Sequence, residues 1–289
     1  MRVVQLTDIH YGAAPSPIDG RDAGVSLRQV LDHVAAHHGP PDLYVATGDL
    51  TDDGSTASAL GLGAVLDALD APVHCVAGNH DSGHTLAALV SRRVHAPTST
   101  RHGNWLFCYV DTNGNGRMRD HHGALIDHPD RQHRASMGTI DPDDLAALDR
   151  TLASSDAPHA MIWLHHPPIM PPTFDDQAAR SPYFHDLAAV LARHPAVHGV
   201  AAGHLHTGYT ATHAGITYYG TTTTWLAMDF AARTLTPPGY RTFVFEPHGH
   251  VTSTAVLIDP PEGAGPHPLP DWVDRVLADH FGLTPQERA

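Results

Sequence analysis

The chain has 289 residues, of which 42% are hydrophobic, so it contains enough apolar material for a large core. It carries 31 acidic and 17 basic residues, and the formal net charge of -14 argues against a general nucleic-acid or membrane-surface binder, which needs a basic face. There is no apolar run long enough to cross a membrane and no pattern of a secretory signal before the opening run "RVVQL", so we expect a cytoplasmic protein.

Short apolar runs alternate with helical periods through the first two hundred residues, which predicts an α/β fold. We expect strands at residues 2–8, 42–49, 72–78, 105–111, 159–166 and 197–204. We expect helices at residues 26–38, 55–70, 82–93, 141–155 and 183–194, with Ser26 and Asp141 as N-caps of the first and fourth. Both cysteines, Cys75 and Cys108, fall in predicted strands, so they are expected to be buried free thiols.

The rhythm of strand and helix is interrupted twice. Residues 112–140 show no period and contain many Gly, His and Asp residues, so we expect a long loop that is functional or mobile, with a cap over the site as one alternative. After residue 208 the pattern becomes alternating and β-branched, which predicts antiparallel strands that close a second sheet. We therefore assign residues 1–258 to one catalytic domain, and residues 259–289 to a Pro-rich linker and a helix over 271–281 that docks on the body or on a partner chain.

Polar side chains follow five of the six predicted strands at the point where each strand ends. These residues are Asp8 and His10, then Asp49, then Asn79, His80 and Asp81, then His165 and His166, and last His204 and His206. In an open α/β sheet the carboxyl ends of the strands line one crevice, so residues far apart in sequence are expected to meet there. Residues two apart in an extended segment point the same way, and the glycine before Asp49, Asn79 and His204 allows close backbone approach.

Carboxylate, imidazole and amide groups without a thiolate form a ligand set suited to Fe, Mn, Zn or Co. Two such ions about 3.5–4 Å apart can clamp the attacking and leaving oxygens of a phosphoryl displacement. One carboxylate must then bridge the two ions. Asp49 is the candidate, because it has no second carboxylate or imidazole two residues further along the chain.

The ordered motifs D-x-H, G-D, G-N-H-D, H-H-P and G-H-x-H resemble those of the calcineurin-like metallophosphoesterase superfamily. Within it, the chain is similar to the bacterial class III cyclic-nucleotide phosphodiesterases and their glycerophosphodiesterase relatives, over residues 2–225. The resemblance implies a four-layer αββα sandwich of two mixed β-sheets flanked by helices. It also implies two metal ions, one held by Asp8, His10, Asp49 and His206 and the other by Asp49, Asn79, His165 and His204.

The same resemblance implies the chemistry of the site. A metal-bridging hydroxide is the expected nucleophile, His80 is expected to protonate the leaving group, and Asp81 is expected to orient His80. The expected substrates are small-molecule phosphodiesters, with 3′,5′-cyclic nucleotides first and glycerophosphodiesters second, and no nucleic-acid polymer or membrane as partner. Two alternatives stay open: a phosphomonoesterase on the same site, and a non-catalytic metal-binding scaffold. A homo-oligomer built on the C-terminal helix also stays open.

Several polar residues have a simpler explanation than chemistry. Any single one of the strand-end residues could be no more than a polar cap on its strand, and His166 and His74 are expected to be packing histidines. The run "TTTTW" at 221–225 is expected to be strand. The remaining residues of this kind lie in the predicted loop and are expected in turns or solvent, or in a substrate cap: Asn113, Asn115, His121, His122, His128 and His133.

Overall fold

The computed structural model describes the whole chain except residues 17, 114–116, 120–124, 128–137, 173–180, 182, 259–266, 272 and 276–289, and gives only the backbone for 117–119 and 125–127. The helices are α1 (Ala23–His38), α2 (Thr56–Asp67), α3 (Gly83–Leu89), α5 (Pro142–Ser154) and α6 (Phe184–Leu191). None of the helices in the described ranges is both long enough and apolar enough to cross a bilayer.

The first sheet has six strands in the order β16-β15-β1-β2-β3-β4. Its members are β1 (Arg2–Leu6), β2 (Leu43–Thr47), β3 (Val73–Val76), β4 (Val94–His95), β15 (Gly239–Phe245) and β16 (Val251–Leu257). The strands β1 to β4 run parallel, while β15 pairs antiparallel with β1 and β16 pairs antiparallel with β15. The carboxyl ends of β1, β2 and β3 therefore lie side by side at one edge of the sheet.

The second sheet also has six strands, in the order β11-β12-β10-β9-β6-β5. Its members are β5 (Ser99–His102), β6 (Trp105–Tyr109), β9 (His159–Trp163), β10 (Val197–Ala202), β11 (Tyr209–His213) and β12 (Ile216–Gly220). The four inner strands are parallel and the two edge strands are antiparallel. Two small hairpins complete the described strands: β7 (Arg117–Arg119) with β8 (Leu125–Asp127), and β13 (Ala227–Asp229) with β14 (Thr234–Thr236).

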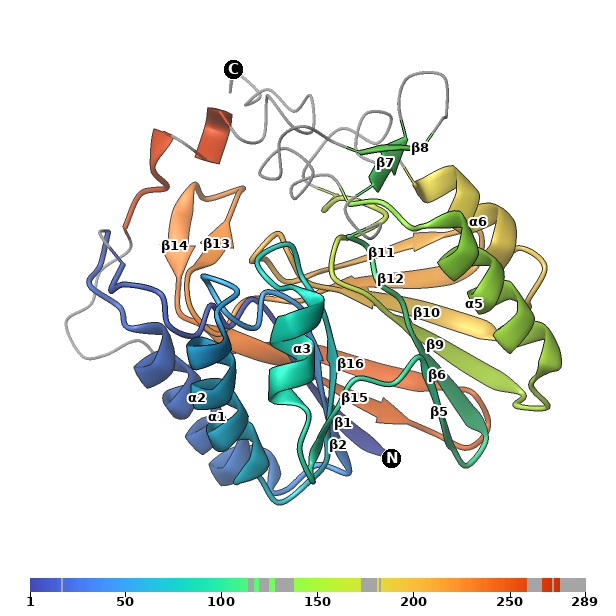
Figure 1. The fold of residues 1–289 in the computed structure, drawn as a ribbon, viewed down its shortest axis with the longest axis horizontal. Coiled ribbons are helices and arrows are strands. Elements are labelled where there is room, and N and C mark those ends of the chain that lie inside the picture. The colour runs from blue at the N-terminus through green and yellow to red at the C-terminus, as the bar shows by residue number, and fades with distance from the viewer. Residues whose placement is uncertain are drawn as a thin grey trace.

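The elements form four layers, with α1, α2 and α3 on one side of the paired sheets and α5 and α6 on the other (Figure 1). An aromatic cluster that includes Phe107, Trp163 and Phe243 fills the space between the two sheets. Aliphatic clusters lie under each helical layer, around Leu27 on the first sheet and Leu187 on the second. Burial of apolar surface on both faces of each sheet explains why the parallel strands are almost continuously hydrophobic. The predicted αββα sandwich of two mixed sheets is confirmed.

The structure corrects several local predictions. The strands after residue 208 do not all join the second sheet, because β15 and β16 extend the first sheet by pairing with β1. Helix α3 ends at Leu89, and the short strands β4 and β5 follow where no strand was expected. The predicted loop 112–140 contains the β7–β8 hairpin. Helix α1 begins earlier than expected, with Asp22 as its N-cap, and Ser26 is instead buried and donates to the Thr224 carbonyl.

The described part of the C-terminal segment packs against the β13–β14 hairpin. The Leu269 amide donates to the Arg233 carbonyl, and the Arg233 guanidinium pairs with Asp274. Leu269 and Val273 are buried there. These contacts place residues 267–271 and 273–275 on the body of the chain, whereas most of the predicted helix over 271–281 lies outside the described residues.

Candidate metal centre

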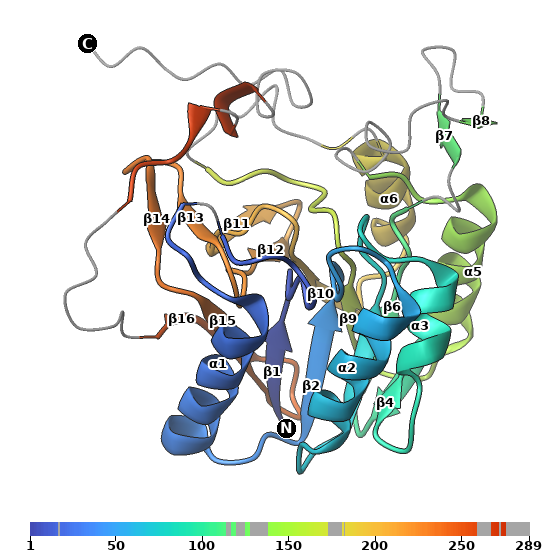
Figure 2. The same cartoon turned by 60° about the vertical axis from the view of Figure 1, so that its left-hand side comes forward.

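The ends of the parallel strands bring the predicted residues together. Strand β1 is in register with β2, and β2 with β3, so the segments that carry Asp8, Asp49 and Asn79 leave the first sheet side by side. The second sheet meets them along β10, where the Gln5 amide donates to the Ala202 carbonyl at 3.2 Å. Figure 2 shows β1 and β2 running side by side in the same direction and ending close to β10 in the middle of the molecule.

The backbone of this site is strained at the ligand positions. In the described part of the chain, seven non-glycine residues have a positive φ, and five of them are predicted ligands: Asp8, His10, Asp49, His204 and His206. A side chain in this conformation costs on the order of 1–3 kcal/mol, so it persists only where the surroundings impose it. The packing around the cluster therefore holds the backbone of these five residues in this conformation.

Glycines let the strand ends approach one another. A Cβ on Gly48 would lie 2.4 Å from Nδ1 of His165, and a Cβ on Gly78 would lie 2.1 Å from the backbone nitrogen of Asp49. A Cβ on Gly203 would lie 1.8 Å from the Thr7 hydroxyl. A side chain at any of these three positions would clash, so glycine is needed there for the strand ends to come close, as expected. Of the three, only Gly48 also has a positive φ.

The two oxygens of Asp49 face two different groups of ligands. Its Oδ1 lies 3.4 Å from Nε2 of His165, and that nitrogen lies 3.1 Å from Oδ1 of Asn79. Its Oδ2 lies 3.7 Å from Nε2 of His10. Asp49 is nearly inaccessible to solvent, at 2% exposure. A carboxylate placed in this way can bridge two cations.

The histidines are oriented through their Nδ1 atoms. Nδ1 of His165 donates to the Thr47 carbonyl at 2.8 Å, and Nδ1 of His206 donates to the Leu226 carbonyl at 2.8 Å. Because a carbonyl oxygen only accepts, the neutral ring must carry its proton on Nδ1, which leaves the Nε2 lone pair for a metal. Nε2 of His206 lies 3.4 Å from Oδ1 of Asp8. Nε2 of His10 is buried and has no hydrogen-bond partner among the described residues, as expected of a ligand atom.

Asp8 is held in place by the neighbouring segment. Both of its oxygens accept from the backbone nitrogen of His204, at 3.1 and 2.9 Å, and Oδ2 also accepts from the Thr7 hydroxyl. These bonds tie the end of β1 to the end of β10, so the first and last motifs of the chain are locked together. The ring of His204 lies 5.1 Å from that of His165.

The electrostatics of the cluster favour positive charge. Burial opposes ionisation of Asp49, but His165 and His10 outweigh it and hold the pKa of this carboxyl well below its usual value. Burial likewise opposes a charge on His165, yet Asp49 and Asp8 raise its pKa to about 9. The pKa of His206 is raised against its burial by Asp8. Anionic carboxylates thus draw protons onto the rings, and bound cations would satisfy the same charge.

His166 also lies close to the second group, because it forms a possible ligand cluster with His165 and His204. Its Nδ1 is 2.8 Å from the Thr112 hydroxyl, and the ring is buried. His165 lies 3.4 Å from Oδ1 of Asp49 and 3.1 Å from Oδ1 of Asn79, as the predicted ligand of the pair should.

The prediction for Asp81 is wrong in its contact. Its Oδ2 accepts from the backbone nitrogens of Leu50 and Gly78, both at 2.9 Å, and its Oδ1 accepts from that of Thr51 at 3.0 Å. Three backbone N–H groups therefore bind the carboxylate and turn it toward the loop after β2 instead of the His80 ring. Asp81 stabilises the loop that carries Asp49.

Asp52 makes the contacts expected of Asp81. Nδ1 of His80 donates to the Asp52 carbonyl at 2.7 Å, and Nδ1 of His10 donates to the Asp52 carboxylate at 3.0 Å. The hydrogen bond from His10 is the largest cause of a lowered pKa at Asp52. Sequence reasoning missed this residue, although a second carboxylate three positions after Asp49 in "GDLTD" was a visible signal.

The other polar residues singled out from the sequence lie near the cluster, in the core or outside the described residues. Asn113 donates to the Gly78 carbonyl and so braces the segment before Asn79. His74 is a packed histidine, as expected, with Nδ1 bonded to the Tyr109 hydroxyl at 2.7 Å. Cys75 and Cys108 are buried free thiols, also as expected. The loop residues Asn115, His121, His122, His128 and His133 lie outside the described part of the chain.

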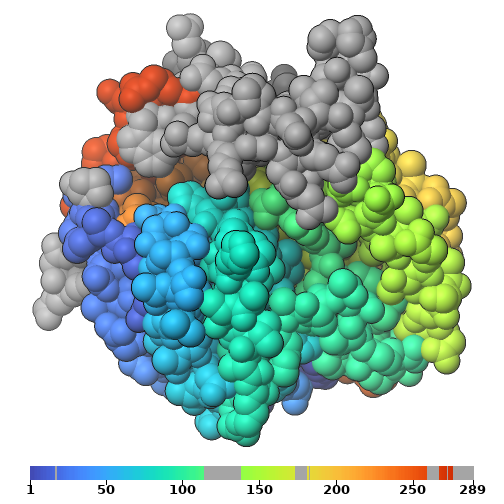
Figure 3. Space-filling model, in the orientation of Figure 1, coloured from blue at the N-terminus to red at the C-terminus, as the bar shows by residue number. Residues whose placement is uncertain are grey.

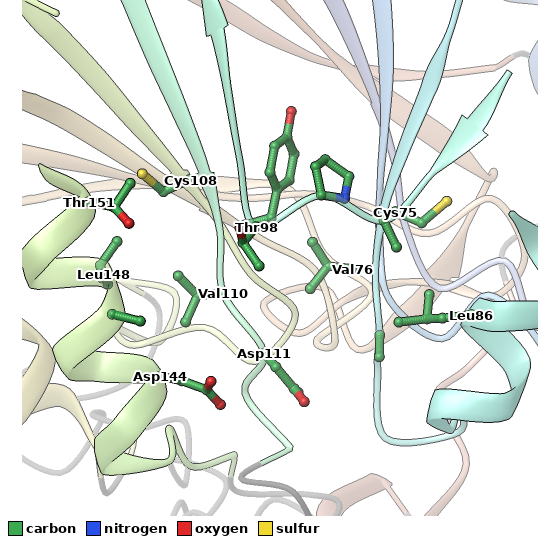
Figure 4. Close-up of a pocket in the computed structure, with 15 residues that line it drawn as sticks. Cys75, Val76, Leu86, Thr98, Cys108, Val110, Asp111, Asp144, Leu148 and Thr151 are labelled. Carbon is green, nitrogen blue, oxygen red and sulfur yellow. The ribbon is translucent and has the colours of Figure 1, made fainter. Parts of the chain in front are cut away.

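A separate cavity of about 290 Å³ lies between α3 and α5. Figure 3 shows the surface over α3 lying between those over α2 and α5 on this face of the molecule. Apolar side chains such as Val76, Val110 and Leu148 line the cavity, and Asp111 and Asp144 lie toward one end (Figure 4). It contains none of the predicted ligands, so it is distinct from the metal cluster.

Comparison with known proteins agrees with the fold and the motifs. A probable cyclic nucleotide phosphodiesterase of Synechococcus sp. is 26% identical over 262 residues, which cover 90% of this chain and 93% of that protein. A 3′,5′-cyclic adenosine monophosphate phosphodiesterase of Vibrio vulnificus is 25% identical over 269 residues, which cover 88% of each chain. The crystal structure of a dimetal phosphatase from Danio rerio has the same fold, with a TM-score of 0.59 and 18% identity over 84% of this chain and 92% of that one.

The model of one family, described as calcineurin-like phosphoesterase, matches residues 1–208. That match begins at β1 and ends just after His206, so it includes all five strand-end motifs. The chain belongs to the calcineurin-like phosphoesterase family.

Proposed function

We propose that this protein is a dinuclear metal-dependent phosphodiesterase that hydrolyses small-molecule phosphodiesters. The observation that carries the proposal is the position of Asp49, whose two oxygens face separate groups of nitrogen and oxygen ligands. A structural site for a single ion does not need a carboxylate that is shared in this way, whereas a two-ion clamp does.

The proposed ligand sets follow the two sides of Asp49. Asp8, His10 and His206 lie on the side of Oδ2, and their ligand atoms lie within 4.8 Å of one another. His165 contacts Oδ1 and Asn79, and the ring of His204 lies 5.1 Å from that of His165, so these three residues are the proposed second set. The mixed oxygen and nitrogen donors suit Fe, Mn or Zn, with Co as a further candidate. When bound, such a pair of cations neutralises the phosphate charge and lowers the pKa of water.

His80 is the proposed general acid. Its side chain is 39% exposed, and its ring stands at 4.7 Å from the ring of His10, so it lies at the open side of the cluster. Because Nδ1 donates to the Asp52 carbonyl, the second proton of the imidazolium must be on Nε2. Nε2 is then the atom that gives a proton to the leaving oxygen of the substrate.

Asp52 is the proposed positioning residue for both the ligand His10 and the acid His80. Its carboxylate fixes the His10 ring and its carbonyl fixes the His80 ring, so one residue sets the spacing between a ligand and the acid. Asp81, assigned by sequence to His80, supports the same loop from the other side through Leu50 and Thr51.

Cyclic nucleotides are the first proposed substrates and glycerophosphodiesters the second. The relatives from Synechococcus sp. and Vibrio vulnificus carry names of cyclic-nucleotide phosphodiesterases and match nearly their whole length. Cytoplasmic localisation, the assignment of residues 1–258 to one domain and assembly into a homo-oligomer stay predictions.

The test is a substrate panel on metal-reconstituted protein. We expect hydrolysis of bis(p-nitrophenyl) phosphate with Mn, and of cyclic AMP in preference to glycerophosphoethanolamine and mononucleotides. Activity on mononucleotides alone would replace the proposal with a phosphomonoesterase, and silence on every ester would favour a metal-binding scaffold.

Two variants separate ligand from acid. His80→Ala should lower turnover by about 10²–10⁴-fold with metal content nearly unchanged, since the ring is not a proposed ligand. Asn79→Ala should reduce the metal content, because it removes an oxygen from the second ligand set. Unchanged turnover in His80→Ala would disprove the role of this residue as the acid.

A further inference from the structure

An indole ring stands directly beside the metal cluster. The ring of Trp225 lies 5.3 Å from the ring of His10, with the two planes tilted by 47°. Trp225 follows β12 in the second sheet, whereas His10 follows β1 in the first. Its side chain is half-buried, so part of the indole is accessible next to a proposed metal ligand. The phosphodiester chemistry derived above leaves this residue without a role.

The ring is held in a fixed position. Nε1 donates to the Arg21 carbonyl at 2.9 Å, and the Trp225 carbonyl accepts from the Arg21 guanidinium at 2.7 Å. The Trp225 amide donates to the Thr223 hydroxyl at 2.9 Å, and that hydroxyl donates to the Asp8 carbonyl. The indole is thus anchored to Arg21, and a chain of hydrogen bonds ties the Trp225 backbone to the backbone of a proposed ligand.

The apolar surroundings of Trp225 extend away from the metals. Ile18, Met228 and Phe230 are partly buried residues that pack, together with Trp225, on the small core under the β13–β14 hairpin. The Met228 amide donates to the His206 carbonyl at 2.8 Å, so β13 lies immediately beside a second proposed ligand. We call these four residues, Ile18, Trp225, Met228 and Phe230, the apolar wall.

We propose that Trp225 is a specificity-determining residue that stacks on a planar ring of the substrate, so that the site prefers nucleotide esters over aliphatic phosphodiesters. This inference rests on the proposed function, because it names the part of the substrate that lies outside the phosphate. In a nucleotide a single ribose separates the phosphate from the base. The indole lies 5.3 Å from the ring of the proposed ligand His10, so it is close enough to the phosphate site for a base to reach it. Every base has a π-face, so the contact is expected to be tolerant of base identity.

The contribution of stacking sets the expected size of the effect. Replacement of an aromatic platform weakens binding of a nucleotide by roughly 5- to 150-fold, whereas a ligand without a base loses nothing. Two matched variants separate the aromatic face from the bulk of the side chain. Trp225→Phe keeps an aromatic ring, and Trp225→Leu is apolar and close to phenylalanine in size without one, so both should still pack against Ile18, Met228 and Phe230.

The experiment measures binding of AMP and of ribose 5-phosphate to the metal-loaded protein by calorimetry. These ligands share the sugar and the phosphate and differ only in the base. We expect the wild-type protein to bind AMP more tightly, Trp225→Leu to lose most of this preference through weaker AMP binding, and Trp225→Phe to retain much of it. Ribose 5-phosphate should bind all three proteins equally, and metal content should be unchanged.

Turnover gives a second readout. Trp225→Leu should raise KM for cyclic AMP with little change in kcat, and leave kcat/KM for glycerophosphoethanolamine as it is. Equal binding of AMP and ribose 5-phosphate by the wild-type protein, or an equal loss of both in Trp225→Leu, would overturn the inference. If no diester is hydrolysed but the preference for AMP depends on Trp225, the inference stands and the phosphodiesterase function fails.

Discussion

Gly78 lies so close to Asp49 that one methyl group would disturb the carboxylate proposed to bridge the metals. A Cβ at Gly78 would lie 2.1 Å from the Asp49 backbone nitrogen and 2.3 Å from its Oδ1, and real Cβ contacts essentially never fall below 3.0 Å. Gly78 does not have a positive φ, so Gly78→Ala adds a steric clash without a backbone penalty. The nearest atom belongs to the backbone and cannot rotate away.

The clash can be relieved only if the segment after β3 and the segment after β2 move apart. Overpacking of this kind costs about 1–3 kcal/mol in the free energy of unfolding. The movement also withdraws Asp49 from both ligand groups, since its Oδ1 and Oδ2 serve different sides. We therefore expect Gly78→Ala to lose metal from both positions, together with most of the activity.

The assay combines metal analysis of the purified protein with urea unfolding. Gly83→Ala is the matched control, because a Cβ there meets nothing within 4 Å and Gly83 is the first residue of α3, where alanine is the better helix former. If Gly78→Ala kept its full metal content and unfolded within about 0.5 kcal/mol of the control, the account of close approach at this strand end would be refuted.

Three further predictions concern residues and ions around the same core. Asp52→Ala should weaken metal affinity by about 10- to 100-fold in a metal titration, because His10 loses its carboxylate partner, and equal affinity would contradict its positioning role. Burial lowers the pKa of the His74 ring to about 4 in the folded protein. As the pH falls from about 6.5 to 4, the unfolded chain binds a proton on this ring and the folded protein does not, so the free energy of unfolding falls by roughly 2–3 kcal/mol. The difference in urea unfolding energy between wild type and His74→Phe should shift by that amount between pH 7 and pH 4, and a constant difference would be inconsistent with it. Chelation should lower the Tm of the wild-type protein, since metal at 100 times its Kd stabilises by about 2.7 kcal/mol, and Mn should restore it; a Tm unaffected by chelator would count against bound metal.

The strand-end residues could be found from sequence because two local rules determine their place. Apolar runs mark the strands, and the carboxyl ends of parallel strands meet at one edge of a sheet, so Asp8, Asp49 and Asn79 had to lie close together whatever the loops did. The glycines before these residues were visible for the same reason, since close backbone approach needs a residue without a side chain.

The sheet that each strand after residue 208 joins could not be predicted in this way. Residues 239–257 have the same alternating pattern as residues 209–220, yet they pair with β1 and complete the first sheet. The alternating pattern of a strand specifies which of its residues share a face, but it does not specify the strand with which it pairs. That information lies in contacts between residues more than two hundred positions apart.

The sequence by itself therefore predicted which residues gather at the ends of the strands, because strand ends and residue types are local properties. The tertiary structure alone decided which way each side chain points. Asp81 turns to the backbone donors of Leu50 and Thr51, Asp52 takes the place beside His80, and Trp225 arrives from the other sheet. The physical reason is that hydrogen-bond partners in these loops come from several strands at once, and no single segment carries that information.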